Sequence, residues 1–131
     1  MDRWPDIIPV VIHHLSSSLS LPAGRVATRV RADVDTLPEF VRVRRGPGSD
    51  DEVTDSPLID VETFTLSATP STAWDLAEDA RQAMHAMAGT SFSGALVDSV
   101  STATSPTEID YGNAKLIRYV ASYRLRLRKV F

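Results

Sequence analysis

Residues Leu116–Lys129 read Leu-Ile-Arg-Tyr-Val-Ala-Ser-Tyr-Arg-Leu-Arg-Leu-Arg-Lys, with apolar and basic side chains in alternation. Successive side chains of a β-strand point to opposite faces of its sheet. One face of this strand would carry Ile117, Tyr119, Ala121, Tyr123, Leu125 and Leu127. The other would carry Arg118, Val120, Ser122, Arg124, Arg126 and Arg128. Because a column of arginines is too costly to bury unpaired, we expect a long strand with one buried face and one face available to a partner.

The length and composition are those of a single globular domain. The chain has 131 residues, of which 43% are hydrophobic and 24% are charged, so residues 1–131 can form one core. Charged, histidine, proline or glycine residues interrupt every apolar run, and we expect no membrane span and no secretory signal. The absence of cysteine excludes disulfides and cysteine-based metal sites.

Charge is divided unevenly along the chain. Residues 111–131 contain two lysines, four arginines and no acid, which gives +6; since the whole chain carries −3, residues 1–110 carry −9. Such separation favours contacts between copies or with partner proteins. An acidic chain without aromatic residues among its basic ones is not typical of a nucleic-acid-binding protein.

The remaining periodicity predicts two helices and four further strands. Asp6 can cap a first helix with an apolar stripe formed by Ile8, Val11, Ile12, Leu15 and Leu19. Thr69 and Pro70 begin a second helix that ends near Gly89. Its stripe is Ala73, Leu76, Ala77, Ala80, Ala83, Met84 and Met87. The other strands are expected at residues 25–31, 39–45, 58–66 and 94–102, with a loop at 103–114.

This order, α-β-β-β-α-β-β, predicts an α+β fold. We expect a single mixed, largely antiparallel sheet of about five strands with two helices packed on one face. Between the second and third strands, residues 46–56 combine glycine and proline with Asp50, Asp51, Glu52 and Asp55. That composition predicts a long, acidic, exposed loop within the domain.

No group of residues has the pattern of an active site. The three histidines lie on expected helices, and no Gly-x-Ser-x-Gly sequence is present. His13 and His14 are adjacent on a helix, so they diverge by about 100° and cannot chelate one ion together. The acids of residues 46–56 lack the spacing of a calcium loop. We therefore expect no catalytic residue, no cofactor and no metal ligand.

The outward face of the sheet is the candidate site. If the strands are adjacent, it brings together three sets of side chains: Phe40, Arg42 and Arg44; Asp60, Glu62 and Phe64; and Arg118, Arg124 and Arg126. One interpretation is a solvated ladder of ion pairs. The other is a subunit or partner interface, because exposed Phe40 and Phe64 beside arginines match the composition of binding surfaces.

Several stretches, in order over nearly the whole chain, resemble the tail terminator proteins of long-tailed (siphovirus-type) bacteriophages. They are Pro-Asp-Ile-Ile-Pro-Val-Val at 5–11, Phe-Val-Arg-Val-Arg-Arg-Gly at 40–46, Leu-Ile-Asp-Val-Glu-Thr-Phe at 58–64, Ala-Trp-Asp-Leu-Ala at 73–77 and Arg-Tyr-Val-Ala-Ser-Tyr-Arg-Leu at 118–125. The sequence departs from the family in the acidity of residues 50–55 and at Val30-Arg31, where a proline is expected.

The resemblance implies a structural virion protein located at the tail–neck junction and assembled in the host cytoplasm. Such proteins form a ring, typically a hexamer, that caps the tail tube, ends its polymerisation and joins it to the neck. The implied partners are further copies of the chain, the tail tube protein and a neck or connector protein. DNA would pass through without specific binding, and Asp50, Asp51, Glu52 and Asp55 would face the lumen. Another neck or head–tail connector component is the alternative, and a small α+β enzyme domain is a third.

Overall fold

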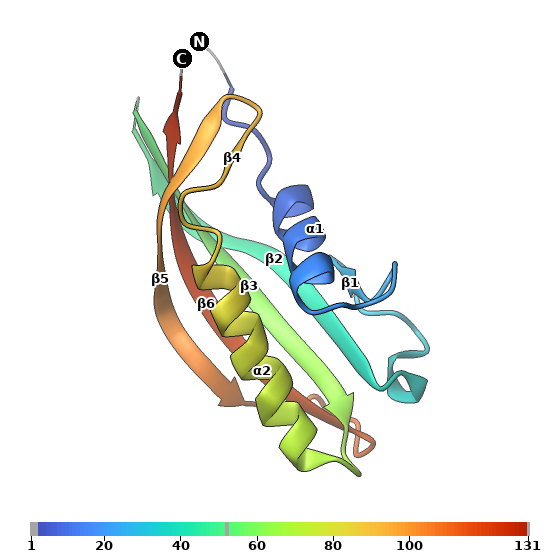
Figure 1. Ribbon diagram of the computed structural model, residues 1–131. Coiled ribbons are helices and arrows are strands. Elements are labelled where there is room, and N and C mark those ends of the chain that lie inside the picture. Colours follow the sequence, from blue (N-terminus) through green and yellow to red (C-terminus); the bar gives the residue numbers. More distant parts are fainter. Residues whose placement is uncertain (1–2, 52, 131) are drawn as a thin grey trace.

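The computed structural model describes residues 3–51 and 53–130, which form two helices packed on a curled sheet (Figure 1). In chain order the elements are α1 (Ile8–Ser18), β1 (Val26–Ala27), the 3-10 helix η1 (Val34–Thr36), β2 (Glu39–Asp50), β3 (Thr54–Leu66), α2 (Pro70–His85), β4 (Ser91–Phe92), β5 (Ala95–Glu108) and β6 (Leu116–Lys129). The six described strands have the spatial order β1-β2-β3-β6-β5-β4. Only β1 and β2 are parallel.

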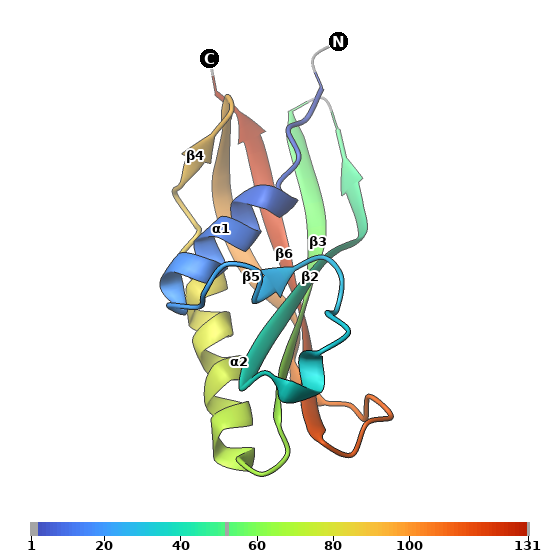
Figure 2. The same cartoon turned by 90° about the vertical axis from the view of Figure 1, so that its right-hand side faces the viewer.

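The expected α+β fold is confirmed in its main features, a mixed and largely antiparallel sheet with two helices. The described sheet has six strands rather than about five, because the short β4 adds to the edge beside β5. Both helices lie on the same side of the sheet (Figure 2), as the sequence predicts. Within the part of the chain that the structure describes, no helix is long and apolar enough to cross a membrane.

Strand β6 lies between β3 and β5 and has the predicted bounds. Its inward side chains enter the main core, where Ala121, Tyr123, Leu125 and Leu127 are at most 4% exposed. The alternation of the sequence is therefore confirmed as an alternation of burial from Ala121 to Leu127, whereas Ile117 and Tyr119 are only half-buried and Leu116, on the other face, is buried. The backbone N–H and C=O groups of β6 are hydrogen-bonded to the strands on both of its sides. Together with its buried apolar face, this pairing places β6 at the centre of the domain.

The two helices close this core from one side. The Asp6 carboxylate accepts a hydrogen bond from the Ile8 N–H at 3.0 Å, and α1 then buries Val11 and Leu15. Helix α2 begins at Pro70, as predicted, and buries its whole expected stripe. All seven stripe residues are alanine, leucine or methionine, and six of them lie within α2, which ends before Met87, so α2 can lie close to the sheet.

The expected long loop at residues 46–56 is wrong. Strand β2 continues to Asp50 and β3 begins at Thr54, with Ser49 opposite Ser56 and Asp50 opposite Asp55. The register shifts between Gly46 and Ser49, which accommodates the intervening proline. A Cβ at Gly48 would lie 2.5 Å from the Ser56 carbonyl oxygen, so the glycine permits close approach of the strands rather than a loop.

Two other boundaries also differ from expectation. Strand β1 contains only Val26 and Ala27 of the expected 25–31, because the chain then turns into η1. Strand β5 continues through the first half of the expected loop, to Glu108, and its last residues pair with β6, with Thr107 opposite Val120. Its serines and threonines follow β6 with register shifts, so they give no clear alternation in the sequence.

Replacing Leu125 with alanine should lower the free energy of unfolding by about 2 to 5 kcal/mol, because the side chain is fully buried among close-packed neighbours. Chemical denaturation of the variant and the parent protein measures the loss. The matched control is Val53→Ala, since Val53 is 61% exposed and its truncation should change stability by less than about 0.5 kcal/mol. Equal effects of the two substitutions would show that the inward face of β6 is assigned wrongly.

Candidate functional site

The sheet face opposite the helices gathers most of the predicted site residues on β2, β3 and β6. Arg42 is opposite Glu62, Arg44 is opposite Asp60, and Leu58 is opposite Arg124. We call the charged side chains on this side the arginine face, namely Arg42, Arg44, Asp60, Glu62, Arg118, Arg124 and Arg126. They carry five positive and two negative charges, so the face is basic on an acidic protein.

Glu62 is the anionic centre of the arginine face. Only 2% of its side chain is exposed, and its carboxylate accepts hydrogen bonds from Arg42 Nε and, at 3.0 Å, from Arg118 Nη1. Arg44 Nε lies at 4.0 Å. The hydrogen bond to Glu62 raises the pKa of the Arg42 guanidinium above its ordinary value. Charge-assisted bonds of this kind compensate the desolvation of a buried carboxylate.

Phe40 and Phe64 are buried, so their expected exposure beside the arginines is wrong. They are 0% and 1% exposed and belong to a second apolar cluster with Val34, Leu37 and Leu116. Their rings meet edge to face with centroids 6.2 Å apart. The segment containing η1 folds over this end of the sheet, and that long-range packing has no local signal in the sequence.

Arg118 fastens a second segment over the same end. Its Nε donates to the Ile109 carbonyl oxygen at 3.2 Å, its Nη2 donates to that of Asp110 at 3.1 Å, and its guanidinium lies 5.2 Å from the Tyr111 ring centre. The Tyr111 ring in turn meets Phe64 edge to face at 4.9 Å. Arg118 therefore has a structural role in addition to its ion pair, and only 16% of its side chain is exposed.

Three arginines of the face remain available to a partner. Arg44 is 52% exposed, and Arg124 donates one hydrogen bond, from Nη1 to the Ser56 carbonyl oxygen at 3.2 Å. Arg126 is exposed and makes no hydrogen bond or ion pair within residues 3–51 and 53–130. These side chains, rather than the phenylalanines, form the accessible part of the predicted interface.

The predicted lumen-facing acids do not form one group. Asp50 and Asp51 are exposed near the tip of the β2–β3 hairpin, whereas Glu52 lies outside the described residues. Asp51 accepts hydrogen bonds from the Val53 and Thr54 N–H groups at 2.7 Å, which lowers the pKa of its carboxyl group. Asp55 is only 3% exposed and pairs with Arg45 at 3.1 Å, so its expected exposure is wrong.

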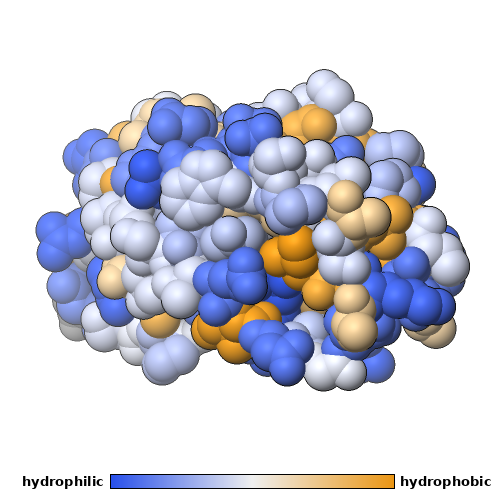
Figure 3. Space-filling model, turned by 90° about the horizontal axis from the view of Figure 1, so that it is seen from below, coloured by the Kyte–Doolittle hydropathy of each residue, from blue (hydrophilic) through white to orange (hydrophobic). Residues whose placement is uncertain are grey.

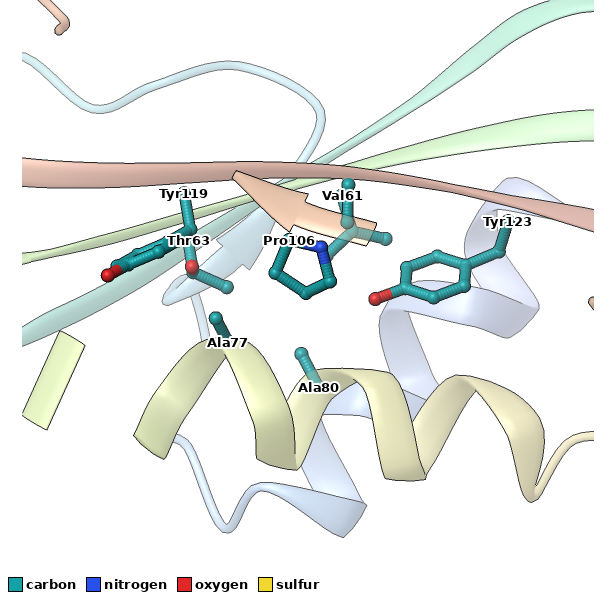
Figure 4. Close-up of a pocket in the computed structure, with 8 residues that line it drawn as sticks. Val61, Thr63, Ala77, Ala80, Pro106, Tyr119 and Tyr123 are labelled. Carbon is teal, nitrogen blue, oxygen red and sulfur yellow. The ribbon is translucent and has the colours of Figure 1, made fainter. Parts of the chain in front are cut away.

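The crevice between α2 and the sheet does not provide a ligand site. It is lined by Ala77 and Ala80 of α2 and, from the sheet, by Val61, Thr63, Pro106, Tyr119, Ala121 and Tyr123 (Figure 4). It has no room for a water molecule. Burial raises the pKa of Tyr123, whose ring closes one side of the crevice, to about 12.

The histidines also have structural contacts. His14 Nε2 lies 2.7 Å from the Ala83 carbonyl oxygen and so links α1 to α2, and His85 Nε2 lies 2.8 Å from Thr102 Oγ1. Among the described residues, no three histidine, aspartate or glutamate side chains are grouped as metal ligands would be.

The lower end of the domain, where α2 and β6 begin, exposes apolar surface. Trp74 is 47% exposed, Ile109 43% and Tyr111 37%. Figure 3 shows this end, with apolar patches lying between hydrophilic side chains. Aromatic and aliphatic surface of this kind is a common component of protein interfaces.

Replacing Glu62 with glutamine should lower the free energy of unfolding by about 3 kcal/mol, because Arg42 and Arg118 lose the anion that compensates their partial burial. Chemical denaturation measures the effect. Asp98→Asn is the matched control, since Asp98 pairs with Arg128 at 3.1 Å in an exposed setting and should contribute less than about 1 kcal/mol. A Glu62→Gln variant as stable as the control would contradict the central role of Glu62.

Tyr123 should make the fold sensitive to strong alkali. Its pKa is raised in the folded state from the ordinary value of 10.0 to about 12, so its stabilising contribution is complete below pH 10 and is lost as the pH rises through about 12. Tyrosinate absorbance and circular dichroism, followed together, measure ionisation and unfolding. Tyr123→Phe should move alkaline unfolding to higher pH, and an unchanged midpoint would contradict this assignment.

No family model matches the sequence, and no curated protein matches it significantly. Among solved structures, one chain from "Virion of native gene transfer agent (GTA) particle" has a similar fold, with a TM-score of 0.63 and 16% sequence identity. The match covers 90% of this chain and 91% of that chain. At this level of identity the two chains share an α+β fold over almost their entire lengths.

Proposed function

We propose that this chain is a structural protein of a phage-like virion. It forms a ring at the end of the tail tube, ends tube polymerisation and joins the tail to the neck. The ring is a hexamer, and its partners are the tail tube protein and a neck or connector protein. The role is structural rather than catalytic.

The observation that carries this proposal is the likeness of fold to a chain of a gene transfer agent virion, over 90% of this chain and 91% of that one. The resemblance of the sequence to tail terminators, which extends from residue 5 to residue 125, supports the finer assignment.

The distribution of charge and apolar surface also supports a role in assembly. The arginine face lies on one side of the domain, and exposed apolar side chains lie at its lower end. A subunit of a ring that sits between two other components needs lateral contacts with its own copies and axial contacts with its neighbours. The arginines are suited to the former, and Ile109 and Tyr111 at the lower end are suited to the latter.

The hairpin tip has a separate part in this proposal. Asp50 and Asp51 are exposed at the end of a hairpin that extends beyond the helices (Figure 1). Directed into the lumen of a ring, their carboxylates would repel DNA phosphates and prevent adhesion during passage. Asp55 takes no part, because it is buried against Arg45.

Another neck or head–tail connector component is the second candidate, since the same fold likeness supports any virion structural role. The two candidates differ in what the ring does to the tube. A terminator binds the growing end of a tube and stops further addition, whereas a connector without this activity leaves tube length unchanged.

Native mass spectrometry with and without the tail tube protein tests the proposal. We expect a hexamer of the 14.3 kDa chain, alone or on addition of the tube protein, and tubes of fixed length with a ring at one end in electron micrographs. A chain that stays monomeric in both conditions would contradict ring formation. Rings that leave tube length unaffected would favour the connector instead.

A further inference from the structure

Helix α2 presents an acidic and aromatic surface to solvent on the side opposite its buried stripe. Asp75 and Asp79 are exposed, and neither pairs with a basic side chain among the residues that the structure describes. Glu78 is bound to Arg81 at 3.0 Å and is neutralised. Trp74 is 47% exposed, although its ring rests edge to face against Tyr119 at 5.7 Å.

The accessible arginines of β6 have the complementary property. Arg124 and Arg126 point away from the helices and have no carboxylate partner in the described chain. Glu62 serves Arg42 and Arg118, and Asp60 accepts a hydrogen bond from Ser122 Oγ at 2.8 Å. Asp50 and Asp51 line one surface hollow with Arg126 but form no ion pair with it. Each surface thus carries two like charges that have no ion-pair partner among the described residues of the monomer.

The spacings of the two charge pairs agree. Asp75 and Asp79 are four residues apart on a helix, which corresponds to a rise of about 6 Å. Arg124 and Arg126 are two residues apart on a strand, which corresponds to a rise of about 6.6 Å. Two carboxylates on one copy can therefore face two guanidinium groups on another at the same time.

The two surfaces also lie on opposite sides of the domain. Helix α2 covers the inward face of the sheet, and the arginines of β6 lie on the outward face (Figure 2). Surfaces so placed cannot meet within one molecule. When they meet between molecules, each copy uses one surface toward each neighbour, and a ring results if the rotation closes.

We propose that the arginine face of one copy binds the solvent face of α2 of a second copy, with Arg124 and Arg126 paired to Asp75 and Asp79. Trp74 lies beside these acids and supplies apolar contact area and a ring on which a guanidinium can stack. This inference rests on the proposed ring, and it names the two surfaces through which neighbouring copies in the ring would bind each other. Charge complementarity would set the register and partner choice of the contact more than its strength.

Charge-reversal variants test this contact through the oligomeric state measured by sedimentation. Arg124→Asp/Arg126→Asp and Asp75→Arg/Asp79→Arg should each weaken self-association by at least about tenfold. The chain that carries all four substitutions should assemble again, because the charges of the contact are then exchanged. Arg29→Glu/Lys115→Glu reverses two exposed positive charges elsewhere and is the matched control for the arginine variant.

Mixing the two defective variants distinguishes this contact from others. The intact α2 surface of the arginine variant faces the intact arginine face of the aspartate variant, and the two reversed surfaces are complementary as in the chain with all four substitutions. The mixture should therefore assemble with the two variants in alternation, whereas neither variant assembles alone. Circular dichroism of each variant establishes that it is folded, since exposed charges contribute little to the core.

Two results would overturn the contact. If folded arginine and aspartate variants assemble like the parent protein, the ring proposal stands and its interface lies elsewhere. If the parent protein is monomeric at every concentration and with the tube protein present, both the ring and this contact are wrong.

Discussion

A central strand whose side chains alternate between apolar residues and arginines determines which side of the sheet the helices can cover. Strand β6 is hydrogen-bonded to a neighbouring strand on each side, and this pairing fixes which of its side chains lie on each face of the sheet. The face with Tyr123, Leu125 and Leu127 requires a covering layer, which α1 and α2 supply. The opposite face must then remain open, and the arginines on it become the main feature of the exposed sheet.

Glu62 makes this open face compatible with a stable fold. Its buried carboxylate holds Arg42 and Arg118, and Arg118 also fastens the segment that covers Phe64. The basic side chains near Glu62 are thus part of the folded structure. Farther along β6, Arg124 and Arg126 contribute little to the stability of the monomer. We therefore attribute their positive charges to contacts with another molecule.

Features set by local alternation were predictable from the sequence, and features set by long-range packing were not. The bounds of β6 and the buried stripe of α2 follow from periods of two and of 3.6 residues. The burial of Phe40 depends on Phe64 and Leu116, which lie far from it in the sequence, and Asp55 meets Arg45 only through the register of the hairpin. Gly48 reads as part of a loop in the sequence, yet it allows two strands to approach closely. For the site, the sequence predicted the arginines but not which of them the monomer itself uses.

The central claim is that the outward face of β6 is a contact between copies, and disulfide trapping tests it most directly because the chain has no cysteine of its own. Cysteines would replace Arg126 and Asp79 together, which leaves Arg124 and Asp75 to hold the two surfaces in register. Under mild oxidation, this double variant should form a ladder of covalent oligomers that ends at the size of the ring, and each single variant should not. Rings that assemble without any cross-link, or covalent dimers of the Arg126→Cys variant alone, would contradict the claim.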